Sequence, residues 1–83
     1  MKSIPLVISA DYCGDHRIHL RFDDGLEKTV DFRGWLRGPI FVPLLDPAEF
    51  RRFRIDGGTV AWPNGADIAP ETLHAAPPAE DAA

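Results

Sequence analysis

Two histidines are the side chains in this sequence best placed by type to hold a metal ion. His16 and His19 are three residues apart, in a segment whose strict alternation of apolar and polar residues predicts a strand. Residues three apart on a strand point to opposite faces, so the two imidazoles cannot converge on one ion without other ligands. We therefore expect no metal site and interpret both as exposed strand histidines.

The remaining candidates for catalysis have simpler structural explanations. Cys13 would be a nucleophile only beside a base that lowers the pKa of its thiol, and no Cys-His signature surrounds it. Asp23-Asp24-Gly25 is typical of a hairpin turn. Gly57-Gly58 is not followed by a helix start, as a phosphate-binding loop would be. We expect no catalytic residue, no cofactor and no enzymatic activity.

Arginines interleaved with aromatic residues make residues 33–54 the stretch best suited to contact a macromolecule. This composition suits an acidic protein surface or a nucleic acid, and the simplest alternative is a solvated face. The candidate partner-binding residues are Trp35, Arg37, Phe41, Arg51, Arg52 and Arg54.

A second conspicuous segment runs from Trp62 to Asp67. Trp62 is expected to pair with Phe53 in the core, and Asn-Gly forms a turn. We interpret the segment as a structural clasp that joins a hairpin to the final helix, with direct partner contact as the alternative. Its members are Trp62, Pro63, Asn64, Gly65 and Asp67.

Length and composition describe one small domain. The chain has 83 residues, of which 45% are hydrophobic, and a single cysteine, so no intramolecular disulfide can form. A reducing compartment and a cytoplasmic location are expected. The first apolar run is too short for a signal peptide, and no run approaches the ~18 residues of a spanning helix, so no membrane partner is expected.

The charge is uneven along the chain. All nine Lys and Arg lie in residues 1–54, whose net charge is +1, whereas residues 55–83 carry −5. The overall charge of −4 argues against avid, nonspecific binding to phosphates.

Alternation and turn residues predict the first three strands. Residues 4–12 form a strand with Leu6, Ile8, Ala10 and Tyr12 on one face. Residues 16–22 and 26–32 form a hairpin in which Phe22 lies opposite Leu26, both pointing inward. This register places Arg21 opposite Glu27 and Arg17 opposite Asp31, and turns Lys28 inward, from where it would have to reach solvent.

The rest of the chain shows shorter elements. Residues 33–38 form a turn and residues 39–45 an extended segment. Asp46 caps a short helix ending near Arg52, with Glu49 reaching back to the cap. Residues 53–56 and 59–62 form a second hairpin, and Pro70 opens a helix to about residue 75. The predicted fold is α+β: an antiparallel sheet of about five strands, from two hairpins and the N-terminal strand, with two short helices. Residues 1–75 form the domain and 76–83 a disordered tail.

Several of these segments together carry a family resemblance. They are Leu20-Arg21-Phe22-Asp23-Asp24-Gly25, Val30-Asp31-Phe32, Leu45-Asp46-Pro47 and the run from Gly58 to Leu73, which includes Trp-Pro-Asn-Gly-Ala-Asp. In these, residues 4–75 resemble the bacterial domain-of-unknown-function family 2442. The resemblance implies a small α+β domain without established catalytic residues. Where relatives tend to carry an aromatic residue after the last helical leucine this chain has His74, so no packing role is expected there.

The resemblance also bears on function. Such domains are often encoded next to another small protein, in modules suspected to be toxin–antitoxin-like, and this chain would be the antitoxin. We therefore expect a protein-interaction module with a small protein partner, bound through a sheet edge or the surface of residues 33–54. A homodimer through sheet edges is compatible with this hypothesis. A nucleic-acid-binding regulator that uses residues Arg33 to Arg54 is the weaker alternative.

Overall fold

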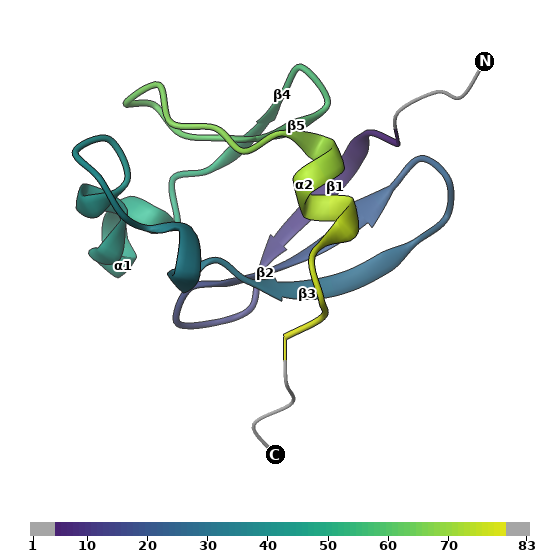
Figure 1. The fold of residues 1–83 in the computed structure, drawn as a ribbon, viewed down its shortest axis with the longest axis horizontal. Helices are drawn as coiled ribbons and strands as arrows, with labels where there is room; N and C mark the ends of the chain where they lie inside the picture. Colours follow the sequence, from purple (N-terminus) through teal and green to yellow (C-terminus); the bar gives the residue numbers. More distant parts are fainter. Residues whose placement is uncertain (1–4, 80–83) are drawn as a thin grey trace.

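Two antiparallel sheets and two short α-helices make up the computed structural model, which describes residues 5–79 (Figure 1). The elements are β1 (Val7–Tyr12), β2 (Arg17–Phe22), β3 (Glu27–Asp31), η1 (Arg33–Trp35), η2 (Val42–Leu45), α1 (Pro47–Phe50), β4 (Arg54–Asp56), β5 (Thr59–Ala61) and α2 (Pro70–Ala75), where η1 and η2 are 3-10 turns. The predicted α+β class with about five strands is confirmed, although the strands form sheets of three and two rather than one sheet. The expected strand start at Ile4 and the end of the expected tail, residues 80–83, lie outside the described residues.

The β2–β3 hairpin has the predicted register. The amide of Phe22 donates to the Leu26 carbonyl at 2.8 Å, and Arg21 lies opposite Glu27. The Glu27 carboxylate nevertheless makes a diagonal contact, because its Oε1 lies 3.2 Å from His19 Nε2. Leu26 is 37% exposed and not inward as expected, since it lies at the turn.

A β-bulge changes the inward face of β1. The register shifts between Val7 and Ser9, and an extra residue reverses the alternation of side chains. As a result Val7 is buried, whereas Leu6 and Ile8, both expected inside, are exposed. Ala10, beyond the bulge, packs against the core as predicted.

Lys28 points inward as predicted, and its side chain is half-buried. Its Nζ donates to the carbonyls of His74, at 2.6 Å, and of Ala76, which lie at the C-terminal end of α2. Such carbonyls have no partner within the helix, and a cation there is favourable. His74 also packs, contrary to expectation: its ring meets Phe22 edge-on at 4.9 Å, and its Nε2 lies 2.8 Å from Asp24 Oδ2.

The chain continues to pack beyond residue 75, where a disordered tail was expected. Ala76 is buried, and the amide of Ala79 donates to the Thr29 carbonyl on β3 at 2.7 Å. The small residues of this segment lack large apolar anchors, but they fit along the edge of a strand, where backbone groups need partners.

The segment of residues 39–45 is folded into turns and is not extended as expected. Gly38 has φ +83°, a left-handed conformation that suits glycine, and its carbonyl accepts from the amides of Phe41 and Val42. After these turns only Leu44 of the segment is buried.

The start of α1 was predicted correctly. Asp46 Oδ1 accepts from the Ala48 amide at 3.0 Å, and Pro47 occupies the first helical position. Glu49 does not reach back to this cap, since its Oε2 contacts Arg52 at 3.4 Å.

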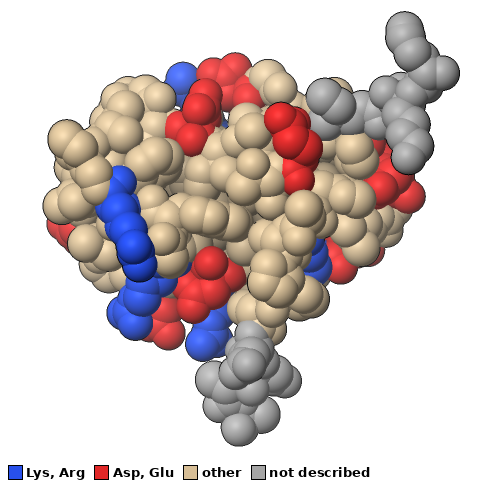
Figure 2. Space-filling model, in the orientation of Figure 1, with Lys and Arg blue, Asp and Glu red and all other residues tan. Residues whose placement is uncertain are grey.

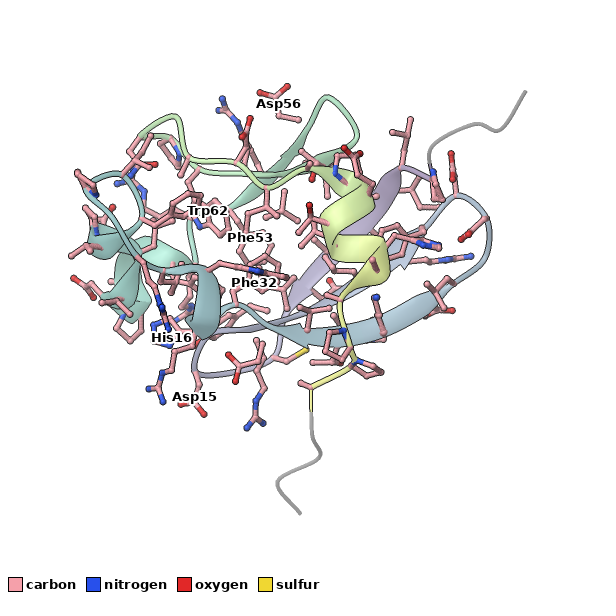
Figure 3. The ribbon with its side chains drawn as sticks, viewed as in Figure 1. Asp15, His16, Phe32, Phe53, Asp56 and Trp62 are labelled. Carbon is pink, nitrogen blue, oxygen red and sulfur yellow. The ribbon has the colours of Figure 1, made fainter. Side chains whose placement is uncertain are left out.

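An aromatic cluster joins the two sheets (Figure 3). The Phe50 ring lies 5.8 Å from Phe32 and 5.7 Å from Trp62, while Phe32 and Trp62 are 6.0 Å apart. The predicted hairpin at Gly57-Gly58 is confirmed. Phe53, however, contacts Phe50 at 6.3 Å, and no ring pair joins it to Trp62 within residues 5–79. Phe50, which sequence patterns did not single out as a core residue, is the centre of the cluster.

Candidate protein-interaction surface

Residues 35–45, here called the apolar lobe, form the most apolar exposed segment of the structure. Ile40, Val42 and Leu45 are 44%, 49% and 43% exposed, and the neighbouring Pro39 and Pro43 are exposed as well. In Figure 2 the left side, where Figure 1 places this part of the chain, is mostly free of charged residues and is crossed by a band of Lys and Arg. Neighbouring exposed apolar residues of this kind mark interaction sites more often than scattered ones do.

Three hydrogen bonds from other parts of the chain hold the apolar lobe and its flank in place. Asn64 Nδ2 donates to the Ile40 carbonyl at 2.8 Å. His16 Nε2 lies 2.9 Å from the Leu45 carbonyl and must carry the proton, because a carbonyl only accepts. Trp62 Nε1 donates to the Phe50 carbonyl, at the end of α1, at 2.8 Å. The apolar lobe is therefore ordered before any partner binds.

The aromatic residues predicted for partner binding anchor the apolar lobe more than they project from it. Trp35 is half-buried, with its ring edge-on to Phe32 at 5.2 Å, and Phe41 is half-buried against the core. Exposed apolar surface comes instead from the aliphatic residues Ile40, Val42 and Leu45, which are not among the predicted binding residues. The signal for them was present: seven consecutive residues from Pro39 are apolar, more than a 3-10 turn can bury on one side.

The predicted arginines do not form one surface. Arg37 belongs to the apolar lobe, whereas the Arg51 guanidinium lies over the Tyr12 ring, 5.1 Å from its centroid. Arg52 is paired with Glu49 beside α1. Arg54 contacts Asp56 at 3.7 Å on the β4–β5 hairpin, at the top of Figure 3 and away from the apolar lobe.

The segment from Trp62 to Asp67 closes on itself. The Trp62 amide donates to the Ala66 carbonyl at 2.9 Å, and the Ala66 amide donates to Asn64 Oδ1 at 3.0 Å. Gly65 has φ +92°, and Asp67 forms a β-bridge with Ala61. The Trp62 side chain bonds to the end of α1 and the Asn64 side chain to the apolar lobe, so the segment ties the β4–β5 hairpin to these two parts of the chain. The clasp was predicted to join the hairpin to the final helix, which instead follows it along the chain.

A polar hollow of about 130 Å³ lies next to the apolar lobe, where the β1–β2 turn meets η1. It is lined by Asp15, His16, Arg17, Asp31 and Arg33. His16 is only 6% exposed and meets Phe50 edge-on at 5.1 Å, so it is not the exposed strand histidine expected. Its Nδ1 has no hydrogen-bond partner among residues 5–79. Asp31 and Arg17 face each other across the hairpin, as predicted, and Asp31 accepts from the Arg33 amide.

The other candidates for chemistry are dispersed. His19 Nδ1 lies 3.1 Å from Thr29 Oγ1 on the outer face of the hairpin, away from the buried ring of His16. Cys13 is exposed, and its thiol contacts the Asp11 carbonyl at 3.4 Å. In the described part of the chain, no three His, Cys, Asp or Glu side chains are arranged to hold a metal ion.

A comparison with protein families matches residues 7–78 to the family described as "Protein of unknown function (DUF2442)". The chain belongs to the DUF2442 family. The matched region includes the apolar lobe, the Trp62–Asp67 segment and α2. No curated protein and no solved structure matches the chain significantly. Across residues 5–79, no helix is long and apolar enough to cross a membrane.

The sheet edges of this DUF2442 chain were the other predicted binding site. The amide of Cys13 donates to the Arg17 carbonyl, which fixes the alternation and turns the backbone groups of Ala10 and Tyr12 away from β2. No group within residues 5–79 bonds to these outward groups. At the opposite edge of the sheet, on β3, the Ala79 amide donates a hydrogen bond to the Thr29 carbonyl. At the start of β1 the Val7 amide donates to the Gly58 carbonyl, so each edge is partly covered, and the open part of the β1 edge is at Ala10 and Tyr12.

Proposed function

We propose that this DUF2442 chain is a non-enzymatic protein-interaction module that binds a small protein partner through the apolar lobe. One observation supports this above all: Ile40, Val42 and Leu45 are exposed together on a segment whose conformation is already fixed by hydrogen bonds. A preordered surface loses little conformational entropy on binding, which raises the affinity that a given contact area provides.

The partner we propose is a small protein encoded beside this one, with this chain acting in the manner of an antitoxin. The apolar lobe would cover a complementary surface of that partner. Completing the burial of three half-exposed aliphatic side chains contributes roughly 1 kcal/mol each. Micromolar affinity requires about 8 kcal/mol. The interface must therefore extend from the apolar lobe onto the charged residues around it.

Co-expression with the product of the neighbouring gene tests this function. We expect the two proteins to co-elute in size-exclusion chromatography as one complex. Val42→Asp should abolish co-elution, because it puts a charge into the apolar contact. Ile8→Asp is the matched control, since Ile8 is 54% exposed but lies on β1. Two separate peaks for the wild-type pair, or equal losses from both variants, would contradict the proposal.

Binding to nucleic acid is the second candidate. Arg33, Arg37 and Arg51 are exposed and form no ion pair with a carboxylate within residues 5–79, which favours it. The net charge of −4 and the separation of the arginines speak against it. This candidate predicts salt-dependent binding to DNA or RNA that Arg51→Ala with Arg52→Ala removes, and a lack of binding at low salt would refute it.

A further inference from the structure

Charge is segregated along the described chain in a way that bears on the partner's chemistry. Residues 33–54 hold five arginines against two acids, a net charge of +3. The rest of the described chain, residues 5–32 and 55–79, holds three basic residues against nine acids, a net charge of −6. The exposed apolar residues of the apolar lobe thus lie in the one basic part of an acidic protein.

Both acids of the basic part already have partners. Asp46 caps α1 through the Ala48 amide, and Glu49 contacts Arg52. Arg33 and Arg37 are exposed on either side of Trp35 and form no ion pair within residues 5–79. These two guanidinium groups can accept carboxylates from outside, since each offers several N–H donors in a planar fork.

We infer that the apolar lobe binds an acidic protein segment in which Asp or Glu side chains accompany aliphatic residues. The carboxylates pair with Arg33 and Arg37 while the aliphatic side chains cover Ile40 and Val42. This inference rests on the proposed protein-interaction function and adds the chemistry of its partner. Arginine–carboxylate pairs at the rim mainly set partner choice and association rate, and the aliphatic contacts supply the desolvated centre.

Two other occupants fit the observations less well. A nucleic acid prefers exposed aromatic faces for stacking, whereas Trp35 is half-buried against Phe32. A second copy of this chain would have to present its acidic part to the basic part of the first. A single head-to-tail contact of this kind builds rings or open filaments rather than a two-fold dimer.

The inference can be tested with the intact chain by selection from a phage-displayed library of random peptides. Peptides of about twelve residues are long enough to span the apolar lobe in extended form. We expect the wild-type protein to enrich sequences that combine Asp or Glu with Leu, Ile or Val. A synthetic peptide from the selection should lose at least about tenfold in affinity, roughly 1.4 kcal/mol, towards Arg33→Glu with Arg37→Glu. Its affinity should also fall as the salt concentration rises.

The control is a double variant with the same change in charge away from residues 33–45, Arg21→Glu with Arg54→Glu. Arg21 lies on the outer face of β2, and Arg54 is engaged by Asp56. This control should change the affinity by less than about twofold, as expected for screened distant charges. Circular dichroism spectra of both variants would show whether they are folded like the wild type.

The outcomes separate this inference from the proposed function. Enrichment of purely apolar or basic peptides, or equal losses in both double variants, would overturn the acidic partner while leaving a protein-interaction role intact. No enrichment, together with binding to phosphatidylglycerol vesicles, would assign the surface to anionic lipid and overturn the inference. No enrichment and no co-elution with the neighbouring gene product would remove both.

Discussion

Replacement of Trp62 by alanine is the perturbation that tests the packing account most severely. Trp62 is 2% exposed, its ring lies against Phe50 and Phe32, and its Nε1–H is bonded to the Phe50 carbonyl. Removing a large buried aromatic side chain costs about 3–5 kcal/mol. A domain of this size is stable by only about 0.05–0.15 kcal/mol per residue, so the variant should lose about a quarter of its stability or more.

The variant Trp62→Phe separates the hydrogen bond from the ring. It keeps most of the apolar surface but leaves the Phe50 carbonyl without its donor, at a cost of about 1–3 kcal/mol. Trp35→Ala is a control for losing an indole, because Trp35 is only half-buried and makes no hydrogen bond through its side chain within residues 5–79. We expect Trp62→Ala to lower the free energy of unfolding the most, and Trp62→Phe and Trp35→Ala to lower it less.

Urea unfolding followed by circular dichroism measures these costs without relying on the replaced tryptophan. In thermal melts, Trp62→Ala should lower the melting temperature by about 12–40 °C, since each kcal/mol shifts a domain of this size by about 4–8 °C. An unfolding midpoint for Trp62→Ala equal to that of the wild type would refute the account. If partner binding were lost at the same time, Trp62 would be a contact residue and not part of a structural clasp.

Three smaller perturbations test individual contacts. The amide of Leu26 and the ring of His74 hold the pKa of Asp24 below its ordinary value of 3.8, so the stability this carboxylate contributes is present above about pH 4 and is lost as the pH falls through the lowered pKa. Asp24→Asn should remove that part of the acid sensitivity, measured as the urea midpoint from pH 5 down to about pH 2. Burial lowers the pKa of Lys28 below 10.5. Between the lowered pKa and 10.5 the unfolded chain binds more protons than the folded one, so stability should rise with pH in this range. Lys28→Met should flatten this rise, measured by thermal melts at several pH values. Asn64→Ala should cost about 1 kcal/mol and speed amide exchange in the apolar lobe, and unchanged exchange rates there would show that this side chain does not order it.

Local rules predicted the parts of the fold that depend on neighbours in sequence. The β2–β3 register follows from alternation and the turn at Gly25, and the α1 cap follows from Asp46-Pro47. These features need no knowledge of the rest of the molecule. The same rules wrongly placed Ile8 inside. A β-bulge adds one residue to β1 and has no strong sequence signature, so alternation alone could not predict it.

Predictions that depended on tertiary packing were less successful. The role of Phe50 and the burial of His16 are set by segments distant in sequence that meet at the aromatic cluster. The apolar lobe lies within the predicted stretch of residues 33–54, but its exposed apolar side chains are aliphatic, whereas the predicted Trp35 and Phe41 are half-buried. Whether an aliphatic residue such as Val42 is buried or exposed depends on how the turn is held, and distant contacts such as those of Asn64 and His16 help to determine this.

Hydrogen exchange of the chain alone and in complex with its co-expressed partner tests the central claim most directly. The claim is that the apolar lobe, residues 35–45, is the docking surface. We predict slower exchange for amides within and next to this segment, with little change at Ala10 and Tyr12, whose amides point outward from the open edge of β1. Protection confined to the β1 edge, with the apolar lobe exchanging as in the free chain, would contradict the account and assign binding to strand addition instead.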